Sequence, residues 1–472
     1  MQTTSPHEKF TTQTTVVIFG ITGDLAKRKL IPALWRLFTK GYLPNEFSVV
    51  GFARREWSDA SLQALVITIL TEKFDELSTE QLATFSAKFS YTQGDFNSKE
   101  SYDKLASHLT AIDDKTGICS SKVFHLAVPP DLYEGIFTQL HASGLADKCA
   151  DVGGWTRILV EKPFGNDWYS AEALDQKLGS LFREEQVFRV DHYMGKEAIQ
   201  NILAFRFSNS LLEHLWNSTY IERVHIRLWE KLGTEGRGAF YDNVGALRDV
   251  GQNHILQMLA FVAMEDPVVL QADAIRRERA KVLGSLHLIS KEEMPQTVLR
   301  AQYEGYRDED NVNPSSQTET YFRVEAHLDN PRWKGVPFVL ESGKALGEAK
   351  AEIEIVFKKK DSCLCGEGEE IHPQNTLTFR IQPQEEIAIR FFAKHPGFEM
   401  KLEPKVLSFS YGKENEESPD AYERVIFDCI AGDQTLFAST AEVLGSWKFI
   451  TPIIEQWNEV PVHTYKVGWV PE

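Results

Sequence analysis

The first third of the chain alternates short apolar runs with longer amphipathic stretches. Runs rich in β-branched and aromatic residues predict strands at 14–20, 47–53, 122–130 and 157–165, and residues 91–96 predict the end of a further strand. Between the first two, Leu30, Leu34 and Leu37 recur at helical spacing, and Gly41 ends a helix predicted over 24–40. Strand–helix alternation over about 160 residues predicts a parallel, doubly wound Rossmann-like sheet.

The pattern changes after about Val190. Helical periodicity predicts three helices, over 196–209, 246–264 and 271–283. Long alternating runs follow, namely YFRVEAHL, AEIEIVFKK, NTLTFRIQ, EEIAIRFF and VLSFSY. Period-two alternation predicts a large, mostly antiparallel sheet with helices packed on it, an α+β domain. A chain of 472 residues exceeds one compact core, so we expect two domains, 1–190 and 191–472.

Charge and composition narrow the class of protein. Apolar residues make up 42% of the chain and charged residues 25%, which is ordinary for a globular protein. A formal net charge of −17 argues against a nucleic-acid or anionic-membrane surface, although a local positive pocket still suits a phosphorylated substrate. The first dozen residues lack an apolar signal core, and no apolar run approaches the length of a membrane span. We therefore expect a cytoplasmic protein.

The cysteines are few and scattered, at positions 119, 149, 363, 365 and 429. An odd, dispersed set favours reduced thiols over a disulfide framework. Cys363 and Cys365 are spaced to begin a metal site, but no second ligand pair follows, so we expect a reduced pair and no metal. The acidic run at 413–420 predicts a solvated loop.

A glycine turn follows the first predicted strand. It reads Gly20-Ile-Thr-Gly23-Asp-Leu-Ala26 and leads into the first helix. Glycine there lets the backbone approach a pyrophosphate, which the helix N-terminus stabilises. The spacing G-x-x-G-x-x-A is also compatible with a plain tight turn. Its position favours dinucleotide binding, for which the candidate residues are Gly20, Thr22, Gly23, Asp24 and Leu25.

The end of the second predicted strand bears on the choice of coenzyme. NAD-binding folds place a carboxylate there for the ribose hydroxyls, whereas this strand ends in Arg54 and Arg55. A guanidinium binds a 2′-phosphate through paired hydrogen bonds, so Arg54 favours NADP over the alternative of a solvated surface arginine. Asp95, Pro129 and Lys162 follow other strands, at the edge where doubly wound sheets bind ligands.

Residues 189–197, RVDHYMGKE, gather donors just before an amphipathic helix. His192, Tyr193 and Lys196 at a helix N-terminus would make a phosphate-binding site. The alternative is an ordinary helix cap with Asp191 as acceptor. A cap does not need histidine, tyrosine and lysine together, and we favour the phosphate site.

His254 opens the apolar segment ILQMLAFVAM. A lone histidine there is more often a core residue, but hydride loss from a hemiacetal carbon needs a base, which neutral imidazole supplies. Asp249 lies five residues away, roughly 140° round an α-helix, so Asp191 is the more attractive orienting partner. Asp249 is then available to bind sugar hydroxyls, and Glu230 and Lys344 are weaker candidates for the same role.

From about residue 14 to its C-terminus the chain resembles the glucose-6-phosphate dehydrogenase family. The motifs occur in the family's order: GITGDLAKRKL, EKPFG, RVDHYMGKE, GTEGRGAFYDNVGALRDVGQNH and GKAL. The resemblance implies His254 as proton acceptor and Asp191 as its orienting carboxylate. It implies that His192, Tyr193 and Lys196 hold the 6-phosphate of glucose 6-phosphate. The residues that it implies for the sugar are Lys162, Glu230, Asp249 and Lys344.

The same resemblance implies NADP as coenzyme, with Arg54 and Thr22 near its 2′-phosphate. It also implies an assembly, because the large sheet of the second domain usually forms the dimer contact in this family. We therefore expect a homodimer or homotetramer that oxidises glucose 6-phosphate at C1, the first step of the oxidative pentose phosphate pathway.

Two other functions fit part of the pattern. A related dehydrogenase acting on a free aldose would have no phosphate for His192, Tyr193 and Lys196 to bind, although a differently phosphorylated sugar would. A non-catalytic NADP-sensing protein would be expected to lose the base or its carboxylate, yet Asp191 and His254 are both present.

Overall fold

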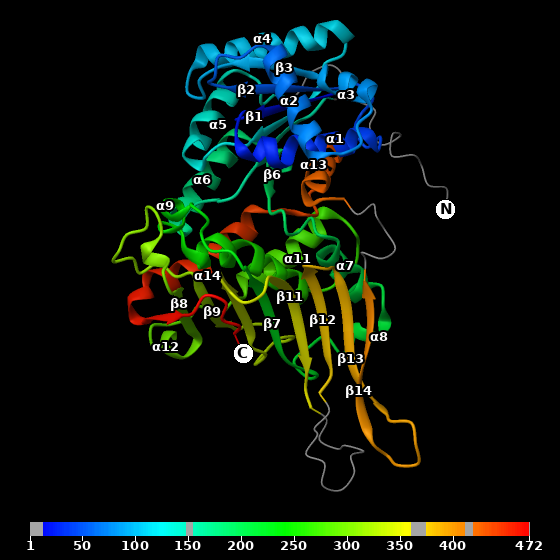
Figure 1. Ribbon diagram of the computed structural model, residues 1–472, viewed down its shortest axis with the longest axis vertical. Helices are drawn as coiled ribbons and strands as arrows, with labels where there is room; N and C mark the ends of the chain where they lie inside the picture. The colour runs from blue at the N-terminus through cyan, green and yellow to red at the C-terminus, as the bar shows by residue number, and fades with distance from the viewer. Residues whose placement is uncertain (1–12, 148–153, 360–373, 411–418, 472) are drawn as a thin grey trace. The chain divides into compact units, whose positions relative to one another are not determined.

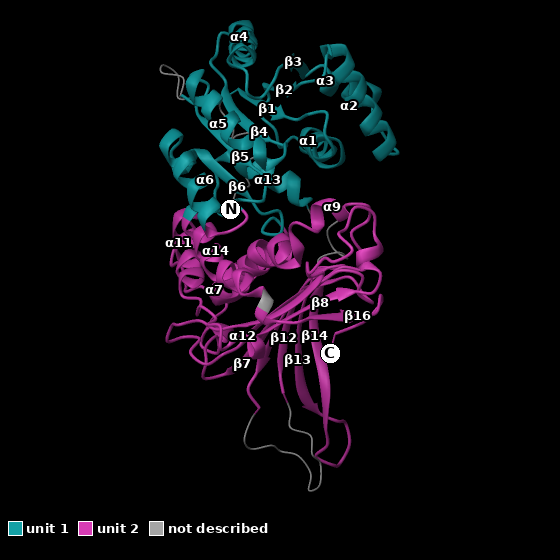
Figure 2. Ribbon diagram, turned by 90° about the vertical axis from the view of Figure 1, so that its left-hand side faces the viewer, with its two compact units in different colours: residues 1–165, 169–195, 419–440 teal, residues 166–168, 196–418, 441–472 magenta. Residues whose placement is uncertain are grey.

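The structure is a computed structural model that describes residues 13–147, 154–359, 374–410 and 419–471. Contacts divide the chain into two compact units, shown in different colours in Figure 2. The first unit is made of residues 1–165, 169–195 and 419–440, and the second of residues 166–168, 196–418 and 441–472. Cys363, Cys365 and most of the acidic run at 413–420 lie outside the described residues.

The first unit contains a parallel sheet with one short antiparallel edge strand (Figure 1). Its strands are β1 (Thr14–Phe19), β2 (Phe47–Ala53), β3 (Phe89–Gln93), β4 (Ser121–Leu126), β5 (Thr156–Val160), β6 (Val187–Val190) and β15 (Phe437–Ala438). The strand order is β15-β6-β5-β4-β1-β2-β3, and β15 alone runs antiparallel to its neighbour among these described strands. The predicted Rossmann-like fold is confirmed.

Helices connect these strands and cover the sheet. They are a π-helical turn (Ala26–Leu30), α1 (Ile31–Thr39), α2 (Asp59–Lys73), α3 (Thr79–Ser86), α4 (Lys99–Thr116), α5 (Tyr133–Ala142), α6 (Trp168–Leu181) and α13 (Ala421–Ala431). Alternate residues of β1 face opposite sides, so Val16 and Ile18 join the core beneath α1, while Phe19 packs against Tyr102 of α4.

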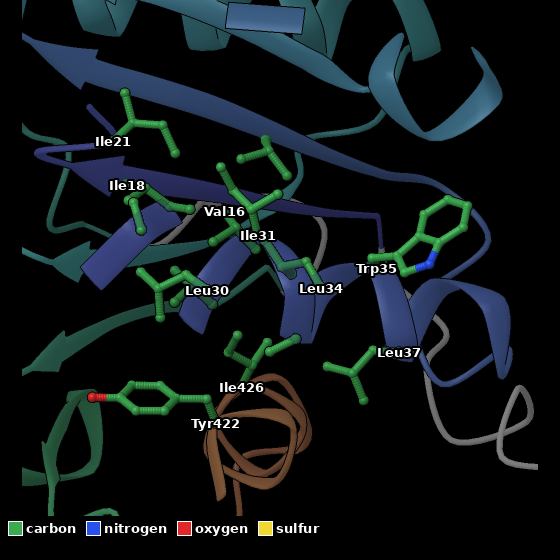
Figure 3. Packing of buried hydrophobic residues seen from close by; sticks show 14 of the residues in the cluster. Val16, Ile18, Ile21, Leu30, Ile31, Leu34, Trp35, Leu37, Tyr422 and Ile426 are labelled. Carbon is green, nitrogen blue, oxygen red and sulfur yellow. The ribbon is translucent and has the colours of Figure 1, made fainter. Parts of the chain in front are cut away.

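Helix α13 comes from a segment that the sequence assigned to the second domain. Its Tyr422 and Ile426 pack with Leu30, Ile31 and other residues of the β1–α1 core (Figure 3). Arg157 of β5 donates to the backbone oxygens of Cys429 and Ile430, at 2.7 and 2.8 Å. The apolar face of α13 and the hydrogen bonds at its C-terminal end thus hold this helix on the first unit. A domain boundary drawn at one point along the chain does not predict this.

The second unit is built on a nine-stranded sheet. Its strands are β7 (Ile221–Trp229), β8 (Val298–Tyr303), β9 (Tyr321–Ala326), β10 (Phe338–Gly343), β11 (Lys350–Phe357), β12 (Thr376–Gln382), β13 (Glu386–Lys394), β14 (Leu402–Ser410) and β16 (Val462–Tyr465). Their order is β14-β13-β12-β11-β7-β10-β9-β8-β16. Among them β7 and β10 run parallel, as do β8 and β16, and the remaining pairs are antiparallel, as predicted.

Helices pack on this sheet, and the π-helical segment among them carries Asp249 and His254 (Figure 1). They are α7 (Glu197–Phe207), α8 (Ser210–Glu213), α9 (Gly238–Tyr241), a π-helical segment (Leu247–Ile255), α10 (Leu256–Ala263), α11 (Ala272–Gly284), α12 (Met294–Thr297) and α14 (Thr440–Glu455). Both α7 and the π-helical segment lie against strands, at β12 and at β7 and β10 respectively.

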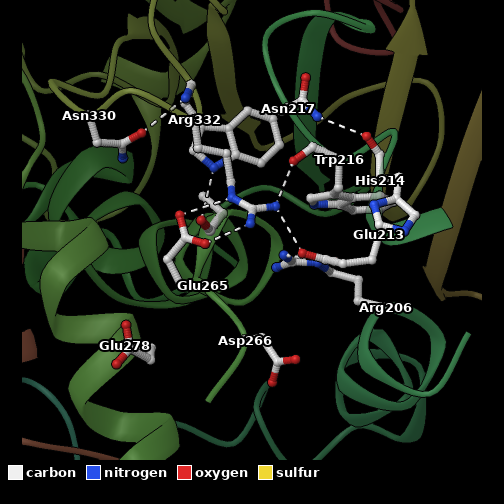
Figure 4. Close-up of polar contacts among 12 residues, drawn as sticks. Arg206, Glu213, His214, Trp216, Asn217, Glu265, Asp266, Glu278, Asn330 and Arg332 are labelled. Atoms are coloured by element: carbon white, nitrogen blue, oxygen red, sulfur yellow. Dashed lines mark hydrogen bonds and ion pairs between the residues drawn. The ribbon is translucent and has the colours of Figure 1, made fainter. Parts of the chain in front are cut away.

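A buried charge network holds α7 in place (Figure 4). The fully buried Arg206 donates to the Val262 oxygen at 2.8 Å and lies 3.4 Å from Glu213. Arg332 then bridges Glu213 at 2.9 Å and Glu265 at 2.6 Å. Removing one partner of such a network leaves a buried charge and typically costs about 3–5 kcal/mol, so α7 is held firmly at its C-terminal end.

Two features of the described residues bear on the cysteines and on membranes. Cys119 is disulfide-bonded, which corrects the expectation of reduced thiols; sequence spacing does not reveal which cysteines meet in space. Cys429 is a free thiol inside α13 and is fully buried. No helix in the described ranges is long and apolar enough to cross a membrane.

Candidate active site

The loop after β1 turns tightly at Gly20. Its φ is +77°, and an added Cβ would lie 2.5 Å from the Ala127 oxygen, so a side chain does not fit. The Gly23 N–H donates to the Gly20 oxygen at 2.8 Å. Helical residues begin immediately, at Asp24. The backbone is therefore open to close approach by a pyrophosphate, with the helix N-terminus beside it.

Of the other predicted turn residues, Thr22 and Leu25 are half-buried and Asp24 is exposed. The sheet order places β1 between β4 and β2, so the turn has the ends of those two strands as neighbours. Doubly wound sheets bind their ligands at the carboxyl ends of neighbouring strands, which is where this turn lies.

Arg54 and Arg55 follow β2 and are both exposed. Side chains of β3 fix their backbone: the Tyr91 hydroxyl donates to the Arg55 oxygen at 2.6 Å, and Gln93 donates to the Arg54 oxygen at 3.3 Å. The Arg55 guanidinium lies 5.9 Å from the Trp57 ring. Within the described part of the chain, no ion pair or hydrogen bond engages the Arg54 guanidinium. Its charge is available to an anionic ligand.

The remaining predicted coenzyme residues of this edge differ in their surroundings. Asp95 follows β3, but its Oδ1 accepts from the Asn97 N–H at 2.8 Å and so supports the turn into α4. Pro129 is exposed just after β4, before a 3₁₀ turn at Pro130–Leu132. The Pro129 oxygen accepts from the Leu132 N–H at 3.1 Å, so its backbone supports that turn while its ring stays exposed.

Lys162 follows β5, next to a buried carboxylate. Glu161 accepts from His125 at 2.9 Å and lies 3.4 Å from the Tyr422 hydroxyl. The Lys162–Pro163 peptide bond is cis, an alternative that the sequence leaves open. Glu161 therefore anchors the end of β5 inside the unit, and Lys162, which is half-buried, comes next along the chain.

The loop 191–195 follows β6 and carries three predicted site residues. Asp191 is 4% exposed, and its Oδ1 accepts from the Tyr193 N–H at 3.0 Å. The rings of His192 and Tyr193 lie 5.1 Å apart. Tyr422 of α13 stacks on His192 with centroids 6.2 Å apart and planes within 14°. Asp191 thus shapes the loop, and Tyr422, which the sequence did not indicate, supports its histidine.

Lys196 immediately precedes α7, as predicted. The N-terminus of that helix is already engaged, since the Ala198 N–H donates to Glu385 Oε2 at 2.9 Å. Burial raises the pKa of Glu385, while the Ala198 N–H and the Lys196 charge oppose this shift. A phosphate would thus rely on side chains such as Lys196 more than on the Ala198 N–H. Glu385 comes from the turn before β13, and no sequence signal pointed to it.

Asp249 and His254 lie on the π-helical segment Leu247–Ile255. A π-helix pairs residues five apart, so these two side chains do not diverge as they would on an α-helix. The prediction that Asp249 faces away assumed α-helical spacing, which this segment does not have, so that reason for preferring Asp191 no longer holds. The choice of Asp191 as partner now rests on the family resemblance. His254 is 2% exposed and Asp249 half-buried.

Glu230 and Lys344 are brought together by the sheet. Strands β7 and β10 are parallel and pair Trp229 with Gly343, so the next residue of each strand lies at the same end. Lys344 forms an ion pair with Glu230, and its ammonium lies 5.1 Å from the Tyr241 ring. The two candidates that the sequence ranked as weaker therefore form a defined polar pair.

The predicted residues fall into two groups. Asp191, His192 and Tyr193 belong to the first unit with the coenzyme candidates, whereas Lys196, Glu230, Asp249, His254 and Lys344 belong to the second. Pairing of Asp191 with His254 remains a prediction. In the ranges that the structure describes, no cluster of three or more His, Cys, Asp or Glu side chains is arranged to hold a metal ion.

Comparison with known proteins covers nearly the whole chain. Residues 17–201 match the model of the glucose-6-phosphate dehydrogenase NAD binding domain, and residues 203–472 match that of its C-terminal domain. The chain is 39% identical to glucose-6-phosphate 1-dehydrogenase 2 of Mycobacterium tuberculosis, over 97% of this chain and 91% of that protein. It is 40% identical to the cytoplasmic glucose-6-phosphate 1-dehydrogenase 6 of Arabidopsis thaliana, over 96% and 88%.

A solved structure is similar over the same extent. It is a glucose-6-phosphate dehydrogenase in complex with its substrate glucose-6-phosphate, which superposes with a TM-score of 0.90 at 34% identity. The match covers 98% of this chain and 96% of that one.

Proposed function

The chain belongs to the glucose-6-phosphate dehydrogenase family, and from this premise we propose that it oxidises D-glucose 6-phosphate at C1 to 6-phospho-D-glucono-1,5-lactone. The hydride passes to a nicotinamide coenzyme. The reaction is the first step of the oxidative pentose phosphate pathway. The observation that carries the proposal is the match of two consecutive family models, to residues 17–201 and 203–472.

We propose NADP as the coenzyme. Support comes from Arg54, whose exposed guanidinium follows β2 and has no protein partner in the described ranges. A charge-assisted hydrogen bond to a 2′-phosphate would satisfy it, whereas the diphosphate would meet the turn at Gly20. When bound, the nicotinamide ring of the coenzyme accepts the hydride.

The proposed roles of the side chains follow from their chemistry. His192, Tyr193 and Lys196 donate to the 6-phosphate, so binding energy from a remote group positions C1. His254, a buried imidazole, accepts the proton of the C1 hydroxyl as the hydride leaves, and Asp191 orients it. Lys162, Asp249 and the Glu230–Lys344 pair bind sugar hydroxyls. Proton and hydride leave together, so the carbon is oxidised to the lactone without net charge on oxygen.

We also propose a homodimer, or a tetramer of such dimers, formed through the large sheet. Strand β14 ends that sheet, and its Leu407 and Phe409, which share one face of the strand, are 63% and 51% exposed. Exposed apolar clusters of this kind mark association surfaces. A cytoplasmic location follows by similarity to the Arabidopsis relative.

A four-way assay of the purified chain tests this function. Glucose 6-phosphate and glucose are each offered with NADP and with NAD, and reduced coenzyme is followed by absorbance. Glucose 6-phosphate with NADP should give the highest kcat/KM, and the acid formed on lactone hydrolysis should be identified by mass spectrometry. Equal rates with glucose and glucose 6-phosphate would contradict phosphate recognition, and no turnover with any pair would contradict the function.

A further inference from the structure

Glu319 is a buried carboxylate that contacts the start of the segment carrying Asp249 and His254. It is 2% exposed and lies just before β9. Its Oε1 accepts from the Leu247 N–H at 2.9 Å, and its Oε2 accepts from the Trp457 indole N–H at 3.0 Å. Its own backbone oxygen accepts from the Ala246 N–H at 3.1 Å. One residue thus binds two consecutive N–H groups at the start of the segment that carries Asp249 and His254.

The Glu319 carboxylate lies so close to residue 245 that only glycine fits there. Gly245 has φ +75°, and an added Cβ would lie 2.5 Å from Glu319 Oε1. Burial raises the pKa of Glu319, and the N–H of Leu247 opposes this shift. Both oxygens face N–H donors, which suits an ionised carboxylate, because a carboxylic acid proton would find no acceptor there.

The next residue, Thr320, extends the contact to Lys344. The Lys344 N–H donates to the Thr320 oxygen at 2.9 Å. The Tyr465 hydroxyl lies 2.9 Å from Thr320 Oγ1 and donates to the Lys344 oxygen at 2.7 Å. Glu319 and Thr320 therefore join two segments that are far apart in the sequence, one bearing Asp249 and His254, the other bearing Lys344.

We propose that Glu319 is a positioning residue for the reaction: its carboxylate holds the π-helical segment Leu247–Ile255 in register with the Lys344 strand end and so sets the placement of His254 and Asp249. The activity part of this inference rests on the proposed function. The hydrogen bonds of Glu319 reach the backbone N–H groups of Ala246 and Leu247 and the Trp457 indole. Glu319 therefore acts on Asp249 and His254 through the position of the backbone. Misplacement of reacting groups by about 1 Å is enough to slow an enzyme up to a hundredfold.

The test compares Glu319→Gln with Glu442→Gln. Glu442 of α14 is the control, since it is fully buried and pairs with Arg279 of α11 at 2.7 Å, and neither helix carries a candidate residue. Both variants lose a buried charge. Only Glu319→Gln should lower kcat for glucose 6-phosphate, by about tenfold, with the KM for NADP unchanged. Equal losses of thermal stability in the two variants, with kcat unchanged in both, would overturn the proposal.

A double variant adds a readout that simple destabilisation would not move. In Glu319→Gln only one of the two side-chain acceptor oxygens remains. If that oxygen keeps the Leu247 N–H, the amide N–H₂ faces the Trp457 N–H, and two donors oppose each other. Trp457→Phe removes that donor while keeping a ring beside Arg300, whose guanidinium lies 5.2 Å from the Trp457 ring. Adding Trp457→Phe to Glu319→Gln should therefore restore part of kcat. Additive losses would contradict the two-donor contact.

Hydrogen exchange separates this inference from the proposed function. In Glu319→Gln, amide exchange should rise in peptides spanning 245–255, and in Glu442→Gln it should not. If the wild-type chain fails to oxidise glucose 6-phosphate, the proposed function fails, whereas the exchange result still decides whether Glu319 holds the segment. Unchanged exchange at 245–255 would overturn the positioning role.

Discussion

The side chain of Arg54 is expected to set coenzyme choice. A guanidinium bound to the 2′-phosphate contributes about 1.5–3 kcal/mol, or roughly ten- to a hundredfold in affinity. Arg54→Ala should therefore raise the KM for NADP by about that factor and leave the use of NAD nearly unchanged. Arg55→Ala is the matched control, because its side chain lies beside Trp57. Measuring kcat/KM for both coenzymes decides the matter; equal impairment of NAD and NADP by Arg54→Ala would assign the arginine another role.

His192 and Lys196 are expected to recognise the phosphate. Lys196→Ala and His192→Ala should each raise the KM for glucose 6-phosphate by at least about tenfold, the scale of one charge-assisted hydrogen bond. Free glucose, a poor substrate, should lose little, because it lacks the group that these residues bind. The check is the ratio of kcat/KM for the two substrates in each variant. A ratio that stays at the wild-type value would show that neither residue binds the phosphate.

Tyr241 and Tyr306 give a matched prediction about stability. Both are buried, but the Tyr306 hydroxyl donates to Asp242 at 2.8 Å, whereas the Tyr241 hydroxyl has no hydrogen-bond partner among the described residues. A buried hydroxyl without a partner costs about 1–3 kcal/mol. Tyr241→Phe should therefore keep or raise the Tm, while Tyr306→Phe should lower it. Calorimetry of both variants checks this, and a clear loss of Tm in Tyr241→Phe would reveal an unseen partner.

At the level of elements, residue patterns predicted most strands and helices. The alternating runs became β9, β11, β12, β13 and β14, and the first β-branched run became β1. Helical spacing also located the 246–264 helix, but not its π-helical first half, because apolar positions over a segment this short indicate a helix without fixing its number of residues per turn. The angle between Asp249 and His254 could not be calculated from the sequence for that reason.

Candidate residues at strand ends were predictable because topology alone brings such ends together. Gly20 and Arg54 follow neighbouring parallel strands, as do Glu230 and Lys344. Glu385, Tyr422 and Glu319 were not predictable from local pattern. Each acts on a segment far away in the sequence, so that its partner is known only once the chain is folded.

Cys429 reports whether α13 stays docked on the first unit. Burial raises the pKa of its thiol to about 12, and the nearby Arg157 opposes this shift. The thiol should thus stay protonated and shielded, and iodoacetamide at about pH 8 should label it only after denaturation. Peptide mass spectrometry identifies the labelled cysteine. Rapid labelling of Cys429 in the native protein would mean that α13 is not held as described.

For the whole molecule, the fold class was predictable but the path of the chain was not. Segment 419–440 returns to the first unit because α13 buries Tyr422, Ile426 and Cys429 against the α1 side of the sheet. A domain boundary placed after Val190 follows the change in sequence pattern, yet pattern alone does not show that a late helix completes an early core. Family membership, by contrast, followed from motifs that span both units.

The proposed roles divide between the units, with the coenzyme residues in the first and the base in the second. Removing the base should therefore spare coenzyme binding. His254→Ala should bind NADP and glucose 6-phosphate with nearly wild-type affinity, because neither depends on proton transfer. Its kcat should fall by at least about 10²-fold, the usual scale for loss of a general base.

The most direct test of the account is accordingly the kcat of a folded His254→Ala variant, measured with saturating glucose 6-phosphate and NADP. If His254 is the base, kcat should fall by at least about 10²-fold, with the Kd of each ligand, measured by calorimetry, close to wild type. Near-normal turnover in the folded variant would contradict it.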